Sequence, residues 1–119
     1  LEEHGLWPQL VAAKNLRLVE PLGYVDFLRL MQEARLAITD SGGIQEETTV
    51  LGIPCLTFRA ETERPVTISE GTNRLVGTDA ATALDAIDDT LAAPMPEGRR
   101  PELWDGQAAG RIAEILVRR

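Results

Sequence analysis

The sequence predicts an α/β domain built as a Rossmann-like parallel sheet with helices on both faces. Three observations predict this fold class: short apolar runs alternate with helical stretches, the connections between them are short, and no internal repeat interrupts the pattern. Parallel strands need crossover connections, which are usually helices. The 119 residues, 44% hydrophobic and 26% charged, suit one domain spanning residues 1–119.

The first half of the chain supplies two predicted strands and two predicted helices. Residues 16–19 form a short apolar run that ends before a proline, which would remove a ladder donor. Residues 25–34 carry apolar side chains at helical spacing, whereas residues 36–39 are a compact apolar run closed by Asp, Ser and Gly. Residues 44–51 are a predicted helix because Gly52 is a good left-handed cap.

The second half continues the alternation. Residues 54–58 and 74–76 are predicted strands, and residues 66–70 form a short helical turn between them. An Ala-rich helix at 80–92 and, after a Pro/Gly/Arg loop, a final helix at 107–118 complete the chain. Ligands of parallel sheets bind at the carboxyl ends of the strands, so the loops after the first three strands are the candidate site.

Composition restricts the function classes. The net charge of −7 argues against a broad nucleic-acid surface, which needs a basic face, although a small anion can still bind locally. No apolar run approaches the roughly 20 residues that span a bilayer, and the chain begins at Leu1 without a signal-like segment. We expect a cytoplasmic fragment of a larger protein, with no membrane partner. Cys55 is expected in the core and His4 at the surface, and we expect no metal site and no cofactor.

The strongest local signal is the turn Asp40-Ser41-Gly42-Gly43, between a predicted strand and a predicted helix. Two glycines at a helix start allow a ligand to approach the backbone, and free N–H groups with the helix dipole favour an anion there. The alternative is that Asp40 or Ser41 only caps the helix. Because no Gly-Lys-Ser/Thr follows, the turn is not a P-loop, and an ATPase is disfavoured.

Three other side chains are candidates for a nucleotide site. Glu47 stands one turn behind Gly43 on the same helix face, where a carboxylate could accept from ribose hydroxyls, while Glu46 is expected to point elsewhere into solvent. Arg64 offers a planar fork to phosphate, and Phe27 an aromatic face to a base. The alternatives are a surface charge for Glu47, a surface salt bridge for Arg64 and a core position for Phe27.

Six segments carry a resemblance to a known family. They are Glu20-Pro21-Leu22-Gly23-Tyr24, Thr39-Asp40-Ser41-Gly42-Gly43-Ile44-Gln45-Glu46-Glu47, Leu51-Gly52-Ile53-Pro54, Thr62-Glu63-Arg64-Pro65, Leu75-Val76-Gly77-Thr78-Asp79 and Asp105-Gly106-Gln107-Ala108. In order and in register, they resemble the C-terminal part of the non-hydrolysing UDP-N-acetylglucosamine 2-epimerases. The departures are Thr48-Thr49, where members commonly carry Ala-Pro, and Val66, where Glu often stands; both put the exact sugar in doubt.

The resemblance implies an isomerase that interconverts UDP-N-acetylglucosamine (UDP-GlcNAc) and UDP-N-acetylmannosamine (UDP-ManNAc) for cell-surface polysaccharides. Its members have two Rossmann-like domains of the glycosyltransferase-B type, and this chain looks like the second. By carry-over, Phe27 packs beside uracil, Ser41, Gly42 and Gly43 hold the diphosphate, Glu47 binds ribose, and Arg64 contacts phosphate. The acid and base groups are implied upstream, so this chain contains no catalytic residue and should be inactive alone.

Two other interpretations stay open beside the epimerase. One is the donor-binding domain of a UDP-sugar glycosyltransferase, and the other is a non-catalytic UDP-sugar binding module. The partners implied by the leading interpretation are a UDP-sugar substrate and a missing N-terminal domain of the same enzyme, with a homodimer left open for the full-length protein.

Overall fold

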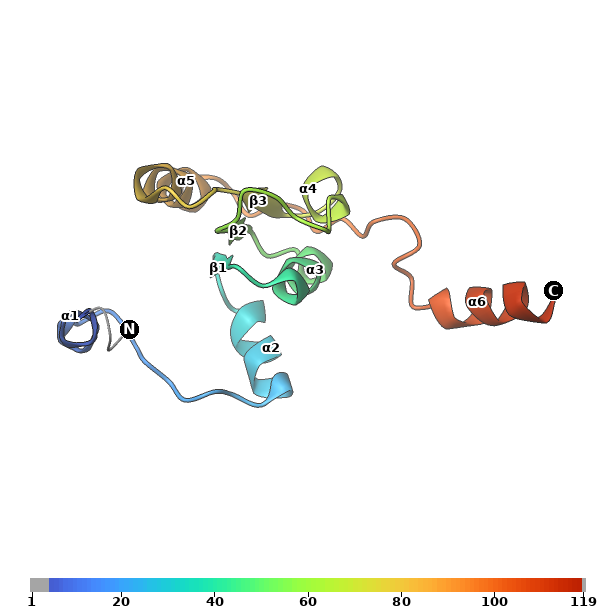
Figure 1. Ribbon diagram of the computed structural model, residues 1–119, viewed down its shortest axis with the longest axis horizontal. Helices are drawn as coiled ribbons and strands as arrows, with labels where there is room; N and C mark the ends of the chain where they lie inside the picture. The colour runs from blue at the N-terminus through green and yellow to red at the C-terminus, as the bar shows by residue number, and fades with distance from the viewer. Residues whose placement is uncertain (1–4, 119) are drawn as a thin grey trace.

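The computed structural model describes residues 5–118 and shows a parallel α/β body with a helix extending from each end (Figure 1). His4, expected at the surface, lies outside the described residues. The helices are α1 (Trp7–Ala12), α2 (Tyr24–Gln32), α3 (Gly42–Leu51), α4 (Val66–Ser69), α5 (Ala80–Ala92) and α6 (Ala108–Val117). None of these helices is long and apolar enough to cross a membrane.

Three short parallel strands form the sheet. They are β1 (Ala37–Thr39), β2 (Cys55–Thr57) and β3 (Asn73–Leu75), in the order β1-β2-β3. In register, Ala37 lies opposite Cys55, and Cys55 lies opposite Asn73. Three of the four predicted strands are therefore confirmed, each with slightly different ends, and so is the parallel arrangement.

The predicted strand at 16–19 is wrong. These residues belong to the extended link between α1 and α2, and Leu16, Leu18 and Val19 are 45%, 45% and 61% exposed. A strand needs a neighbour for its N–H and C=O groups, and within the described residues this segment makes no ladder hydrogen bond. The apolar composition of residues 16–19 suits a strand, but in the described part of the chain no strand lies beside the segment to pair with it.

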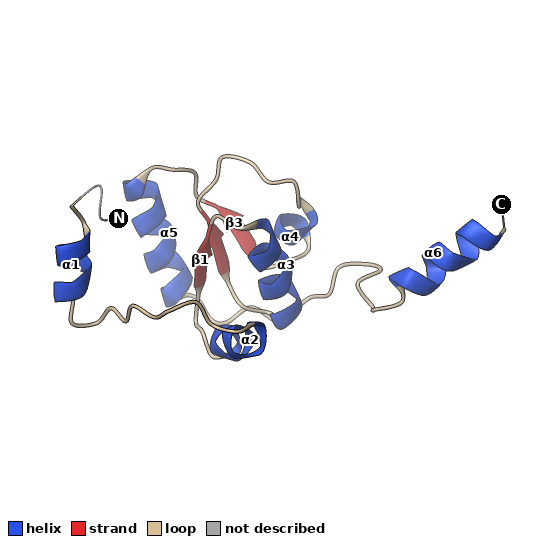
Figure 2. Cartoon of the chain, turned by 60° about the horizontal axis from the view of Figure 1, so that its bottom comes forward, coloured by secondary structure: helices blue, strands red, loops and turns tan. Residues whose placement is uncertain are grey.

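Helices cover both faces of the sheet, as predicted. The crossovers β1-α3-β2 and β2-α4-β3 put α3 and α4 together on one face, and α5 lies on the other (Figure 2). Under α5 the core is apolar: Leu56 and Val76 pack against Ala83 and Ala86. Helix α5 has the predicted ends, and its N-cap Asp79 accepts a hydrogen bond from the backbone N–H of residue 82.

The face under α3 and α4 is buried but polar. Successive residues of β2 point to opposite faces, so Thr57 lies on the side opposite Leu56 and bonds to Asn73 of β3. The buried polar residues of the chain are Gln45, Thr48, Thr49, Thr57, Thr67 and Asn73. A polar interface between a sheet and its helices is stable only where hydrogen bonds satisfy its groups, and these bonds connect to the candidate site described below.

The terminal helices lie apart from this body. Helices α1 and α6 contain no buried residue, and the molecule is 60 Å long but less than 30 Å across. Helix α6, whose ends match the prediction to within one residue, follows a turn fixed by Asp105, which accepts from Arg111 and from the N–H of Gln107. Helix α1 was not predicted; its first turn contains a proline, which is pre-organised for that position.

Candidate functional site

Helix α3 begins directly after the carboxyl end of β1, two residues earlier than predicted. Ser41 is its N-cap, with φ −83° and ψ 132°, and Gly42 and Gly43 are its first helical residues. The N–H groups of the first turn have no partner within a helix, so both glycines present backbone donors at the positive end of the dipole. The Ser41 side chain makes no capping hydrogen bond, which contradicts the alternative that Ser41 serves only as a cap.

The two glycines face different surroundings. A Cβ atom on Gly43 would meet only Ser41 Oγ, at 4.0 Å, so the space in front of Gly43 is open. A Cβ atom on Gly42 would overlap Nη1 of Arg64. The start of α3 is therefore open on the Gly43 side, whereas the Gly42 side is bounded by the Arg64 guanidinium together with Glu63 Oε1, which would lie 2.9 Å from the same Cβ atom. The N–H groups of the first turn, which lack partners within the helix, suit an anion.

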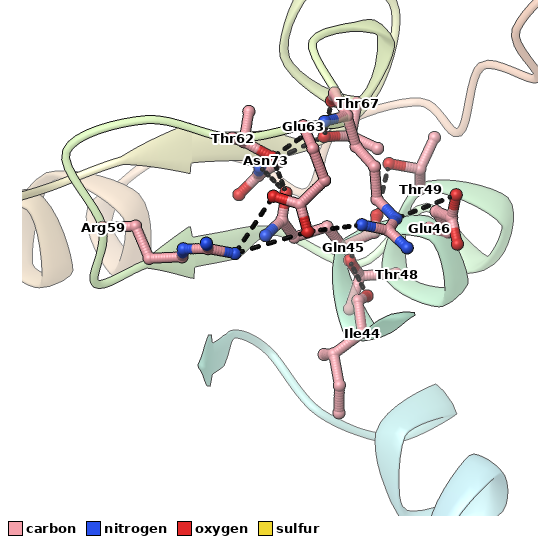
Figure 3. A network of polar contacts seen from close by, with 11 residues as sticks. Ile44, Gln45, Glu46, Thr48, Thr49, Arg59, Thr62, Glu63, Thr67 and Asn73 are labelled. Carbon is pink, nitrogen blue, oxygen red and sulfur yellow. Dashed lines mark hydrogen bonds and ion pairs between the residues drawn. The ribbon is translucent and has the colours of Figure 1, made fainter. Parts of the chain in front are cut away.

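Arg64 reaches this position from the loop after β2. Its Nη1 lies 2.6 Å from Glu63 Oε1, and its Nε lies 3.0 Å from Glu46 Oε1, within ion-pair distance but without the geometry of a hydrogen bond (Figure 3). Glu63 also contacts Arg59 at 3.1 Å. Its own backbone N–H and the two arginines lower the pKa of the Glu63 carboxyl. The expectation that Glu46 points away into solvent is wrong, because Glu46 faces Arg64.

Glu47 lies one turn below Gly43 and is half-buried. Together with Glu46, it lines a surface pocket of about 440 Å³. The other lining residues are apolar or aromatic: Tyr24, Leu28, Val50, Leu51 and Trp104. Glu47 is thus a carboxylate at the edge of an apolar hollow that runs along α3 from its middle to its last residue, Leu51.

Phe27 occupies a neighbouring pocket. It is half-buried on α2 and shares a second hollow of about 440 Å³ with Thr39 and Ile44. Ile44 belongs to the first turns of α3, so Phe27 lies near the proposed cradle but does not share a pocket with Glu47. The structure therefore groups Ser41, both glycines and Arg64, places Glu47 one turn along α3, and puts Phe27 in a separate hollow that it shares with Ile44.

Sequence reasoning missed several residues around the site. The carboxylates of Glu46 and Glu63 hold Arg64, and Trp104 reaches the pocket from the segment before α6. The sequence offers a signal for both carboxylates: Glu63 directly precedes Arg64, and Glu46 lies on the helix that follows the neighbouring loop. No spacing pattern in the sequence predicts that Trp104 lines this pocket, because the residue belongs to the long connection between α5 and α6.

The departures from the family pattern at Thr48 and Thr49 do not reach the pockets. Both side chains are fully buried, and their hydroxyls donate to the carbonyls of Ile44 and Gln45 on the preceding turn. These two threonines therefore fill the interior of the helix packing rather than line either pocket, and the exact sugar stays an open prediction. Position 49 instead packs against Gly71, where a Cβ atom would overlap Thr49 Oγ1.

Cys55 is 1% exposed in β2, and burial raises the pKa of its thiol, which confirms its expected place in the core. Within residues 5–118, no group of three or more His, Cys, Asp or Glu side chains is arranged to hold a metal ion.

Comparisons with known proteins show the family of the chain. Residues 2–117 match the family model of UDP-N-acetylglucosamine 2-epimerase. The chain is 38% identical over 117 residues to the UDP-N-acetylglucosamine 2-epimerase of Methanocaldococcus jannaschii, covering 98% of this chain and 31% of the relative. It is 44% identical over 108 residues to that of Escherichia coli K12, covering 87% of this chain and 28% of the relative.

A solved structure shows the same fold. The chain superimposes on the crystal structure of the M. jannaschii UDP-GlcNAc 2-epimerase in complex with UDP-GlcNAc and UDP with a TM-score of 0.83 and 37% identity, over 100% of this chain and 32% of that one. The chain thus spans about a third of the length of these relatives. It belongs to the UDP-N-acetylglucosamine 2-epimerase family.

Proposed function

We propose that this chain is the UDP-binding part of a UDP-GlcNAc 2-epimerase, and that residues 1–119 form the second of two Rossmann-like domains. The observation that carries the proposal is the start of α3, where an open Gly43 and an unengaged Ser41 hydroxyl lie beside the guanidinium of Arg64. The bound UDP-GlcNAc and UDP of the M. jannaschii relative support a nucleotide-sugar ligand. We place the reaction in the cytoplasm, in the supply of UDP-ManNAc for cell-surface polysaccharides.

The proposed task of this domain is to hold the leaving group. Removal of the proton at sugar C2 and cleavage of the C1–O bond release UDP, and UDP then adds back after reprotonation on the other face. As the C1–O bond breaks, negative charge builds on the diphosphate. In this proposal the N–H groups of Gly42 and Gly43 face the diphosphate, and Arg64, which in this structure pairs with Glu63 and Glu46, turns to the diphosphate when it binds. Backbone donors fixed at the start of a helix stabilise a developing charge without reorganisation.

The other candidate residues fix the nucleoside in this proposal. The Glu47 carboxylate accepts from the ribose hydroxyls, and Phe27 packs beside the uracil. The residues that move the C2 proton lie in the upstream part of the enzyme, so the isolated chain binds UDP weakly and has no epimerase activity.

A chimeric enzyme tests this function. In it, the present chain replaces the matching segment of the E. coli relative, with which it shares 44% identity over 108 residues. We expect the chimera to convert UDP-GlcNAc into a mixture containing UDP-ManNAc, followed by NMR of the sugar protons, and Arg64→Ala to reduce the rate. The control is the isolated chain, which should show UDP-dependent shifts of the Ser41 to Gly43 amides but no turnover.

Two results would contradict the proposed function. A chimera that binds UDP but forms no UDP-ManNAc would contradict the epimerase and favour a glycosyltransferase donor domain or a non-catalytic binding module. A chain whose amides do not respond to UDP would contradict all three.

A further inference from the structure

The backbone of Arg64 is held at both of its polar groups by threonine side chains. Its N–H donates to Thr62 Oγ1 at 3.1 Å, and its carbonyl accepts from Thr67 Oγ1 at 2.7 Å. The first bond closes a tight turn over two residues, and the second joins the turn to α4. The Arg64 carbonyl also accepts from the backbone N–H of Thr67 at 3.1 Å, whereas in the described part of the chain Thr62 alone holds the Arg64 N–H.

Both threonines belong to the buried network around Gln45 (Figure 3). Thr62 Oγ1 donates to Gln45 Oε1 at 2.7 Å. Asn73 Nδ2 donates to the same Gln45 oxygen and to Thr67 Oγ1, each at 3.1 Å. Gln45 Oε1 is therefore connected to the Arg64 N–H through Thr62, and to the Arg64 carbonyl through Asn73 and Thr67.

Gln45 is placed so that this connection has a functional consequence. It is fully buried and lies three residues after Gly42 on the helix whose first turn forms the proposed cradle. Its Oε1 accepts twice, whereas its Nε2 has no hydrogen-bond partner in the described part of the chain. The hydrogen bonds of the network therefore end on the Gln45 side-chain oxygen. They join the loop that carries Arg64 to the first turn of α3.

The ion pairs of Arg64 cannot hold its backbone in place in this way. Glu46 and Glu63 contact only the end of the Arg64 side chain, and these carboxylate side chains are 45% and 55% exposed. Exposed ion pairs are weak and rearrange easily, particularly when a competing anion arrives. The two hydrogen bonds at the Arg64 backbone are part-buried and do not involve the guanidinium, so they can persist when the guanidinium changes partner.

We propose that Thr62 and Gln45 are positioning residues for Arg64: through Thr62 Oγ1, Gln45 holds the Arg64 backbone at a fixed place beside the first turn of α3. The proposal rests on the proposed binding role of Arg64 and adds the device that aims it. If the network only stabilised the fold, its loss would lower the affinity for every ligand equally, whether or not Arg64 is present.

A double-mutant cycle on the full 119-residue chain tests the proposal, with UDP and uridine affinities measured by NMR titration. Thr62→Val removes the hydroxyl and keeps the side-chain shape, and we expect it to weaken UDP about fivefold, the equivalent of one hydrogen bond. Uridine affinity should not change. In an Arg64→Ala background, Thr62→Val should have no further effect on UDP, because there is no guanidinium left to aim. Thr62→Ser, which keeps the hydroxyl, should restore wild-type affinity.

Two further variants keep the test decisive. Thr67→Val removes the hydroxyl bond to the Arg64 carbonyl but keeps the backbone bond from the N–H of residue 67, so it should cause a smaller UDP-specific loss than Thr62→Val. Thr90→Val is the matched control, since Thr90 Oγ1 donates to the carbonyl of Ala86 on α5, away from the network, and it should change neither affinity.

The positioning role and the binding role fail in different ways. An equal loss of UDP affinity from Thr62→Val with and without Arg64, or no loss where Arg64→Ala causes one, overturns the positioning role. If Arg64→Ala itself leaves UDP affinity unchanged, the proposed binding role of Arg64 is wrong, and the positioning role is wrong with it.

Discussion

The guanidinium of Arg64 lies so close to Gly42 that a Cβ atom at position 42 would overlap Nη1 and lie 2.9 Å from Cζ. The two residues come from loops after different strands, β1 and β2, and they meet because the carboxyl ends of parallel strands share one edge of the sheet. Glycine at position 42 therefore has two roles: it exposes a backbone donor, and it leaves room for the cation.

Gly42→Ala should separate ligand binding from stability. The new methyl group meets the far ends of two flexible side chains, Arg64 and its partner Glu63, so the pair can move aside and the fold should survive. Alanine also favours a helix over glycine by about 0.5–1 kcal/mol, which offsets any loss of stability. We expect an unchanged or slightly raised free energy of unfolding, measured by urea denaturation, together with UDP binding weakened about tenfold by the displaced guanidinium.

Gly110→Ala is the matched control for this substitution. Gly110 lies inside α6, and no atom lies within 4 Å of the place that the new methyl group would take, so only the helix-propensity gain applies. Its UDP affinity should equal that of the wild type. If Gly42→Ala also binds UDP normally, the close contact between Gly42 and Arg64 has no role in binding.

Glu63→Gln should strengthen UDP binding. The Glu63 carboxylate lies 2.6 Å from Arg64 Nη1 and competes with a phosphate for that donor. Removal of its charge leaves Arg64 freer to turn to the ligand, and since exposed ion pairs are weak, we expect a gain of about two- to fivefold in titration calorimetry.

Glu61→Gln controls for the change in net charge. Glu61 lies in the same loop, is exposed, and makes the same charge change without a carboxylate at Arg64. A general electrostatic effect would raise UDP affinity equally in both variants and would contradict direct competition by Glu63. The gain should also shrink at high salt in a way that Glu61→Gln does not show.

The sequence predicted best what depends on local interactions. The Ala-rich run at 80–92 predicted helix α5 with its correct ends; in the structure Asp79 caps the helix, and Ala83 and Ala86 face the core. The strand predicted at 16–19 failed because strand formation depends on a partner that local composition does not specify. Helix α3 starts earlier than predicted because the glycines, despite low helix propensity, follow an N-cap serine; propensity is a weak guide at helix ends.

The candidate site was predictable to the level of loops but not of side-chain partners. The parallel topology predicted that the loops carrying Ser41 and Arg64 meet, and the structure brings Arg64 against Gly42. Its pairing with Glu46 and Glu63 depends on side-chain directions in an irregular loop, which has no period to read. The buried hydrogen bonds of Gln45 were likewise hidden, because a glutamine at that spacing is equally compatible with a solvent-facing position.

The start of α6 should resist acid. Arg111, which binds both oxygens of Asp105, and the N–H of Gln107 hold the pKa of that carboxyl well below its ordinary value of 3.8. Because the pKa is lowered in the folded state, this group contributes its stabilisation above the ordinary value and loses it only as the pH falls through the lower folded value. We expect the Gln107 amide resonance to stay constant from about pH 6 down to pH 3 and to move only below that range.

Asp105→Asn provides the comparison for this titration. It removes the charge but keeps the shape, so the Gln107 amide should lie at a shifted, pH-independent position throughout. A wild-type Gln107 resonance that moves with a midpoint near the ordinary value of 3.8 would show that the turn does not hold Asp105 in its charged form.

Glu47→Ala should distinguish a ribose contact from a general effect of charge. Glu47 lies one turn behind Gly43 and lines an apolar pocket along α3, and in the proposed binding mode its carboxylate meets the ribose and not the diphosphate. Loss of hydrogen bonds between a charged group and the ribose hydroxyls should weaken UDP about tenfold or more. Pyrophosphate, which has no ribose, should bind as well as before or slightly better, since a nearby negative charge is gone. The exposed Glu61→Ala, titrated with both ligands, measures the effect of charge alone. An equal change for UDP and pyrophosphate in Glu47→Ala would leave Glu47 as a surface charge that the helix dipole stabilises, and the ribose would need another partner.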